Sequence, residues 1–177
     1  MTIPLEIIDL SKTYDSKEAV RNISFKVNEN EIIGILGPNG CGKTTTIGMI
    51  LGLLKPTKGK VLINGIEIEK QRVELLNELN FISPYIELPK KLTVKHNLEV
   101  YGRLYDVKKL GIKIDYLCEK LRLNEFINKI TGELSSGQKN RVSLAKSIIN
   151  DPSVLLLDEP TASLDPETGD FVRSFLE

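Results

Sequence analysis

Two early segments of the chain alternate hydrophobic and polar residues, and two others are almost continuously apolar. The alternation in LEIIDL (5–10) and ISFKV (23–27) predicts antiparallel strands with one buried face. The runs EIIGILG (31–37) and SVLLL (153–157) are typical of strands that are covered on both faces. The chain is therefore expected to begin with β structure and to return to a buried strand near residue 155.

Turn and helix signals divide the rest of the chain. VLINGIEI (61–68) predicts a hairpin with Asn64-Gly65 at its tip. Helical periodicity dominates from Thr93 to Asn150, and there we expect helices in LTVKHNLEVYGRLY, IDYLCEKLRL and SSGQKNRVSLAKSIIN, the last with one apolar face formed by Val142, Ala145, Ile148 and Ile149. A helix is also predicted at 42–51, and another begins near Pro166. This order predicts an α/β protein with a helical insert.

The composition fits one globular domain of ordinary size. The chain has 177 residues, 41% of them hydrophobic, and its 24 basic residues balance 24 acidic ones. No broad basic field is expected, so we expect no nucleic-acid partner. Two cysteines suit a reducing compartment, and no run approaches the roughly 18 apolar residues of a membrane-spanning helix. We expect a cytoplasmic protein that serves a membrane only from outside the bilayer.

A phosphate-binding loop is predicted between the first apolar run and the helix that follows it. Gly37 to Thr44 fits the pattern G-x-x-x-x-G-K-[ST] in the context that this motif requires. The loop and the helix start would direct N–H groups at phosphates, with Lys43 on the β and γ phosphates and the Thr44 hydroxyl on Mg²⁺. The nucleotide-binding residues expected here are Gly37, Pro38, Asn39, Gly40, Cys41, Gly42, Lys43, Thr44 and Thr45. Cys41 is interpreted as a small residue that fits the turn, not as a catalytic thiol.

Two adjacent acids follow the second apolar run. Ligands of open α/β sheets collect at the carboxyl ends of strands, which is where Asp158 and Glu159 are expected. We expect Asp158 to hold Mg²⁺ and Glu159 to act as the general base that polarises the attacking water.

With LSSGQ (134–138) between these two motifs, the sequence resembles the ATP-binding subunits of ABC transporters over nearly its whole length. The resemblance implies a single ATP-binding domain over residues 1–177: a P-loop NTPase (RecA-like) core, an antiparallel β subdomain and an α-helical subdomain at about 85–150. In the family the signature residues, here Leu134, Ser135, Ser136, Gly137 and Gln138, close over ATP held by a partner subunit. The family's D-loop matches Ser163, Leu164 and Asp165, and Tyr14 matches the ring that stacks on adenine.

The resemblance also implies partners and an activity. A homodimer or a paired ABC subunit would bind two MgATP molecules, with Lys43 and Glu159 catalytic, and an integral membrane permease would use the hydrolysis for transport. The stretch after residue 83 is similar to subunits of the ABC-2 type. Two alternatives remain: a soluble ABC-type ATPase without a transport role, and a non-catalytic fragment.

This sequence departs from the family pattern at two places. The loop that leads into the helical insert has Pro84-Tyr85 where the family has Pro-Gln, and a phenol lacks the carbonyl oxygen of glutamine. The family's switch histidine and the strand that carries it lie beyond Glu177, and His96 is interpreted as a solvated helix residue. We therefore expect a C-terminally truncated subunit that is by itself a poor or inactive ATPase.

Overall fold

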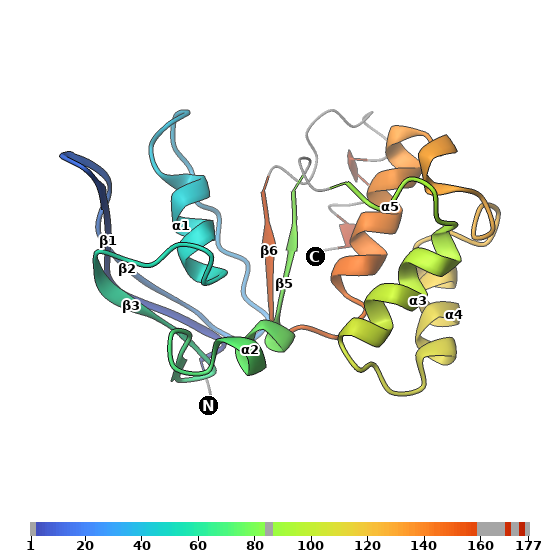
Figure 1. The fold of residues 1–177 in the computed structure, drawn as a ribbon, viewed down its shortest axis with the longest axis horizontal. Coiled ribbons are helices and arrows are strands. Elements are labelled where there is room, and N and C mark those ends of the chain that lie inside the picture. Colours follow the sequence, from blue (N-terminus) through green and yellow to red (C-terminus); the bar gives the residue numbers. More distant parts are fainter. Residues whose placement is uncertain (1–2, 84–86, 159–168, 171–173, 176–177) are drawn as a thin grey trace. The chain divides into compact units, whose positions relative to one another are not determined.

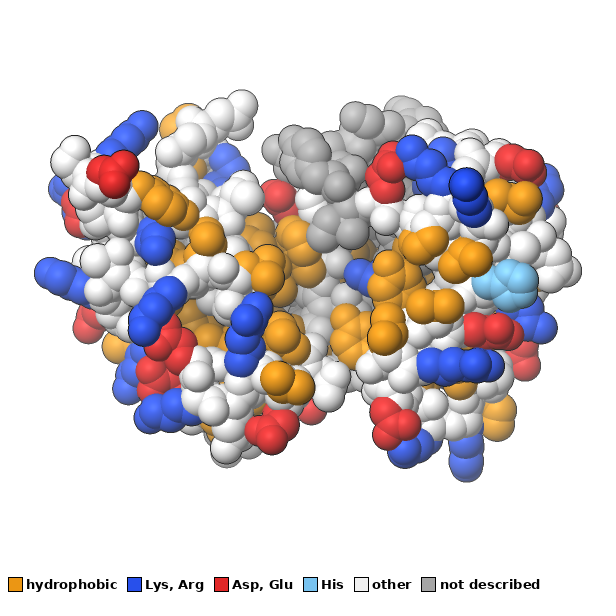
Figure 2. Space-filling view, viewed as in Figure 1, with side chains coloured by type: hydrophobic (Ala, Val, Ile, Leu, Met, Phe, Trp, Pro, Cys, Tyr) orange, Lys and Arg blue, Asp and Glu red, His pale blue; other side chains and the backbone are white. Residues whose placement is uncertain are grey.

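A computed structural model describes residues 3–83, 87–158, 169–170 and 174–175 (Figure 1). The chain divides into two compact units, Met1–Leu79 and Asn80–Glu177. Figure 2 shows basic and acidic side chains intermixed on the visible face of each unit, in keeping with the zero net charge.

A four-stranded antiparallel sheet in the order β2-β1-β3-β4 forms the first unit. The strands are β1 (Leu5–Tyr14), β2 (Lys17–Val27), β3 (Lys58–Ile63) and β4 (Ile66–Glu67). Leu5 in β1 pairs with Val27 on one side and with Ile63 on the other. The strands expected in 5–10 and 23–27 are thus confirmed: Leu5, Ile7 and Leu10 of β1 are buried, and the alternate apolar residues of 23–27 in β2 are half-buried.

The turn between β3 and β4 has the predicted geometry. Asn64 has a φ of 50° and Gly65 a φ of 79°, so both central residues adopt the left-handed conformation that a tight two-residue hairpin requires. Helices α1 (Lys43–Ile50) and α2 (Arg72–Leu75) and the 3-10 turn η1 (Leu76–Glu78) complete the unit. Its buried side chains include Ile7, Leu10, Met49, Ile50 and Ile63.

The strand predicted in EIIGILG is not present. Residues 31–37 lie outside both sheets of the described chain, and Ile32 and Leu36 are 72% and 93% exposed. The prediction was wrong because an apolar run indicates that a segment is suited to burial, whereas a strand also needs a neighbour for its N–H and C=O groups. Neither of the two sheets supplies that neighbour to these residues.

Helices dominate the second unit. β5 (Leu79–Ile82) pairs with β6 (Val154–Leu157), and the arrows of the two strands in Figure 1 point the same way. The helices are α3 (Val94–Leu104), α4 (Leu110–Lys120) and α5 (Ser136–Ser147), with a 3-10 turn, η2 (Thr131–Glu133), before α5. The three helices confirm the predicted helical stretches. The apolar face predicted for the last helix is buried at Val142, Ala145 and Ile149, and Ile148 packs against the same core partly buried.

A buried polar group connects the start of α3 to the turn before α5. The Asn97 amide donates to the Thr131 hydroxyl at 2.8 Å and to the Thr93 carbonyl at 3.0 Å. Thr131 donates in turn to the Leu92 carbonyl at 2.9 Å. Because Asn97 and Thr131 are only 1% and 2% exposed, these bonds fix the approach of the chain to the signature segment.

Two leucines of α3 give a test of the core of the second unit. Leu98 is fully buried in the cluster of apolar side chains, whereas Leu104 on the same helix is 71% exposed. Leu98→Ala should lower the free energy of unfolding by about 2–5 kcal/mol, because it leaves a cavity in a packed core. Leu104→Ala, the matched control, should change it by less than about 0.5 kcal/mol. Urea unfolding followed by circular dichroism measures both, and equal losses would contradict this packing.

Candidate functional site

The loop before α1 has the backbone conformation expected of a phosphate-binding loop. Gly40 and Gly42 have φ values of 81° and 99°, which residues with a side chain rarely adopt. A Cβ on Gly42 would lie 2.3 Å from the Ala19 carbonyl oxygen and 2.9 Å from Cγ2 of Val20. Glycine at position 42 therefore allows the start of α1 to lie directly on β2.

The N-terminus of α1 is open to an anion. Gly42 occupies the N-cap position without a side-chain hydrogen bond, and the first turn contains no acidic residue. The first N–H groups of a helix have no partner within the helix, and their partial positive charge favours a phosphate. The side chains of Thr44 and Thr45 follow at this end, and Thr44 is exposed.

The side chain of Lys43 folds back over the loop. Its Nζ donates to the carbonyl oxygens of Gly37 at 2.7 Å and Pro38 at 3.1 Å. These two bonds hold a positive charge above the loop backbone that runs through Asn39. A phosphate bound along this loop would lie close to the Lys43 amine.

Cys41 and Tyr14 are both accessible. A Cβ on Gly37 would lie 2.5 Å from the Cys41 sulfur, so the thiol packs on the loop backbone while the residue stays exposed. Tyr14 is the last residue of β1 and is 44% exposed. The Lys12 amine lies 5.1 Å from the centre of the Tyr14 ring, a contact that sequence reasoning missed.

The signature segment begins α5 in the second unit. Ser135 is the N-cap: its hydroxyl accepts from the Gln138 N–H at 3.2 Å, and the Gln138 side chain accepts from the Ser135 N–H at 3.1 Å. Leu134 is buried in the core of the unit, whereas Ser136 is exposed. The capping box therefore uses Ser135 and Gln138 for the helix and leaves Ser136 and Gly137 at its exposed first turn.

Asp158 directly follows β6, as the sequence predicts. Its N–H donates to the Ile82 carbonyl at 2.9 Å, which extends the pairing of β6 with β5 by one residue. Several predicted features lie outside the described residues: the general base Glu159, the D-loop residues Ser163, Leu164 and Asp165, the loop residues Pro84 and Tyr85, and the start of the helix expected near Pro166. His96 is at the surface of α3 (Figure 2), which confirms the interpretation as a solvated helix residue.

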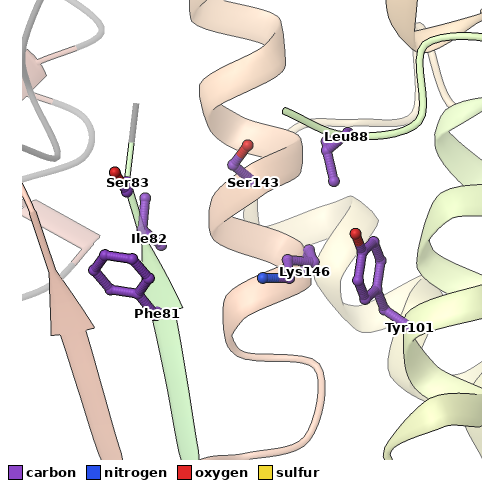
Figure 3. A pocket seen from close by; sticks show the side chains of 7 residues that line it. All are labelled: Phe81, Ile82, Ser83, Leu88, Tyr101, Ser143 and Lys146. Atoms are coloured by element: carbon purple, nitrogen blue, oxygen red, sulfur yellow. The ribbon is translucent and has the colours of Figure 1, made fainter. Parts of the chain in front are cut away.

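A small pocket in the second unit is too narrow for a nucleotide. Its free volume is about 10 Å³, roughly the space that one water molecule needs. Figure 3 shows its lining, which comes from β5, the segment that follows β5, α3 and α5: Phe81, Ile82, Ser83, Leu88, Tyr101, Ser143 and Lys146. Burial lowers the pKa of the Lys146 amine, which lies 5.2 Å from the centre of the Tyr101 ring. The pocket and the phosphate-binding loop are separate features.

Among the residues that the structure describes, no group of three or more His, Cys, Asp or Glu side chains could hold a metal ion. In the same part of the chain, every helix is too short or too polar to cross a bilayer.

Comparisons with known proteins identify the family of the chain. Residues 20–162 match the family model described as ABC transporter, and the chain belongs to this family. Nod factor export ATP-binding protein I of Rhizobium etli is 38% identical over 164 residues, which are 92% of this chain and 52% of that protein. ABC transporter ATP-binding protein NatA of Bacillus subtilis is 33% identical over 180 residues, covering 98% and 73%. The chain thus spans about half the length of the Nod factor relative.

Solved structures give the same result for the fold. An ATP-binding subunit of an ABC transporter superimposes with a TM-score of 0.88 at 26% identity, over 98% of this chain and 72% of that one. An ATP-binding protein of a putative ABC transporter from Pyrococcus furiosus gives 0.84 at 32% identity, over 97% and 83%. A dimeric ATP-binding cassette in a post-hydrolysis state, bound to ADP and Pi, gives 0.84 at 27% identity, over 97% and 81%. The P-loop fold class and the family resemblance are therefore confirmed.

The two cysteines should differ in reactivity. Cys41 is exposed, whereas Cys118 is buried. The pKa of the Cys118 thiol is raised, chiefly by burial and to a smaller extent by the negative charge of Asp115. Thiolates are the reactive species, so in the native protein one thiol should react rapidly with a disulfide reagent and the second only after unfolding. The absorbance of the thiol that the reagent releases measures the rate and the number of reacting cysteines. A rapid phase that survives Cys41→Ser would contradict the assignment.

Proposed function

We propose that this protein is the ATP-binding subunit of an ABC transporter, which binds MgATP and hydrolyses it to drive transport through a separate membrane subunit. The observation that carries the proposal is the loop from Gly37 to Lys43: it ends in an uncapped helix N-terminus, and the lysine amine lies over its backbone. That arrangement suits a triphosphate, because the N–H groups and the amine supply positive charge to successive phosphates. Membership of the ABC transporter family supports the same nucleotide.

Magnesium is the expected metal. The donors predicted for it, the Thr44 hydroxyl and the Asp158 carboxylate, are hard oxygen ligands of the kind that Mg²⁺ prefers, and Thr44 is exposed at the start of α1. If the Thr44 hydroxyl and the Asp158 carboxylate hold the ion, it would supply positive charge that neutralises the charge developing on the phosphates during transfer. In this proposal Glu159 takes the proton of the attacking water, and Lys43 stabilises the charge on the phosphates.

A second copy or a paired subunit would complete the reaction. The capping box engages Ser135 and Gln138, and in the first turn of α5 Ser136 is exposed and Gly137 half-buried. A hydroxyl and N–H groups at a helix start suit the γ phosphate of a nucleotide held by another chain. The solved cassette that is dimeric and bound to ADP and Pi supports this arrangement for a relative. Ser163, Leu164 and Asp165 would lie along the same dimer contact as the D-loop.

The membrane partner is inferred from the relatives. One of them is named for Nod factor export, and another solved relative is described as part of the cbiONQ transporter complex. We infer that this protein acts on the cytoplasmic side of a membrane, bound to a permease that selects the transported substrate. Contact with it would involve the loop at Pro84-Tyr85 and the helices that follow, where the missing glutamine alters the coupling to the nucleotide.

Replacement of Lys43 tests the nucleotide site. Lys43→Ala should weaken MgATP binding by at least about tenfold, because it deletes charge-assisted hydrogen bonds to the phosphates. Isothermal titration calorimetry measures the affinity. Lys58→Ala, which removes an exposed lysine of β3, is the matched control and should bind as the parent does. Equal affinities of Lys43→Ala and the parent would refute the proposed site.

Replacement of Glu159 tests the general base. In a form of the protein that hydrolyses ATP, Glu159→Gln should leave MgATP binding intact and slow hydrolysis by about 10²–10⁴-fold, because an amide does not accept the proton of water. Phosphate release measured beside a binding titration separates the two effects. Turnover at the parental rate in the variant would show that Glu159 has no such role.

A further inference from the structure

We propose that Lys12 is a positioning residue for the nucleotide base: it holds the ring of Tyr14 in place and prepares the ring for stacking on adenine. The inference rests on the proposed function, because it concerns the same nucleotide site. It assigns a role to a lysine that lies outside the P-loop, the signature segment and the acids after β6.

Lys12 contacts the ring and the chain after α1 at the same time. Lys12 lies two residues before Tyr14 on β1. The Lys12 amine lies 5.1 Å from the centre of the Tyr14 ring and donates to the Lys55 carbonyl at 2.7 Å. The amine is thus held against the ring by a fixed backbone acceptor.

The same stretch of β1 is tied to Thr57 by two hydrogen bonds. The Thr57 N–H donates to the Ser11 carbonyl at 2.8 Å, and the Thr13 N–H donates to the Thr57 hydroxyl at 3.0 Å. These bonds come from the residues on either side of Lys12. They fix the strand end from which Tyr14 projects relative to the segment that follows α1.

The strand end is also linked to the phosphate-binding loop through β2. Lys12 is paired with Val20 across the β1–β2 ladder. Val20 and its neighbour Ala19 are the residues that Gly42 approaches so closely that a Cβ there would clash with both. Lys12, Val20 and Gly42 therefore form a short structural connection between the proposed base platform and the start of α1.

The charge of Lys12 acts on the ring in a way that a neutral side chain does not. A cation is attracted to the negative face of an aromatic ring. Tyr14 remains 44% exposed, so part of its surface is available to a base. A cation over the ring offsets part of the negative charge of its face, which reduces the repulsion between that face and the face of a stacked base. The Lys12 cation also limits the orientations of the exposed Tyr14 side chain. Less conformational entropy is then lost when the ring becomes ordered on binding the base.

The experiment compares two ligands of different composition in the full chain. Lys12→Met should weaken MgATP binding by about two- to fivefold, the range expected from one exposed cation–π contact. Binding of magnesium tripolyphosphate, which has no base, should be unchanged. Calorimetry measures both ligands. Lys12→Arg should restore MgATP affinity, because guanidinium keeps the cation and a donor for the Lys55 carbonyl.

Further variants separate the charge from the hydrogen bond and from general charge loss. Lys12→Gln keeps a donor but no cation, so it should bind MgATP as weakly as Lys12→Met does. Lys60→Met removes an exposed lysine of β3 and should leave both ligands unaffected. In a double-mutant cycle, Lys12→Met should have little further effect in a Tyr14→Leu background. Melting curves verify folding, and Lys12→Gln and Lys12→Arg keep the test decisive if Lys12→Met does not fold.

Three outcomes would overturn the inference while leaving the proposed function intact. The first is an unchanged MgATP affinity of Lys12→Met in a parent that binds MgATP. The second is an equal loss for MgATP and tripolyphosphate, which would make Lys12 a phosphate ligand. The third is an undiminished Lys12→Met effect in the Tyr14→Leu background. If the parent chain itself binds neither ligand, the proposed function fails and the inference fails with it.

Discussion

The close approach of Gly42 to β2 is the constraint on which the nucleotide site depends. A side chain at position 42 would lie 2.3 Å from the Ala19 carbonyl, so only glycine allows α1 to begin at this point. Where α1 begins determines where its unpaired N–H groups lie and where Lys43, its first residue, projects. The antiparallel sheet is therefore more than a neighbour of the phosphate-binding loop, because its second strand sets the position of the helix start.

The two helix starts proposed to bind phosphate are built differently. The start of α1 has a glycine N-cap without a side-chain hydrogen bond, and it needs a lysine to add charge. The start of α5 is closed by two reciprocal hydrogen bonds between Ser135 and Gln138, which engage the N–H groups of both residues. A site with more open donors is suited to hold a whole triphosphate, whereas the capped start is suited to contact a single terminal phosphate. This difference accords with the primary and secondary roles proposed for the two sites.

Local structure was predicted from the sequence where residue type alone determines the backbone conformation. Asn64-Gly65 formed the expected turn because few other residues adopt two successive left-handed conformations, and the spacing around Lys43 fixed a loop and a helix start. The failures were tertiary. EIIGILG has the apolar character of a buried strand, but pairing depends on a neighbour that local sequence does not specify. Lys12 was overlooked because a lysine in an alternating strand is usually a solvated residue.

Irregular pairing of β1 explains why alternation alone did not reveal the environment of Lys12. The β1–β2 register shifts between Ile7 and Leu10 and again on both sides of Lys12, and Asp9 and Asn22 have positive φ values of 48° and 43°. Such irregularities redirect side chains relative to a regular ladder. They occur in the stretch of β1 that pairs with β2, bonds to Thr57 and places Lys12 over the ring of Tyr14. In a regularly paired strand all the backbone hydrogen bonds to the neighbouring strand would form, and successive side chains would alternate strictly between the two faces. The departures from regular pairing are therefore part of how this sheet adapts to the site beside it.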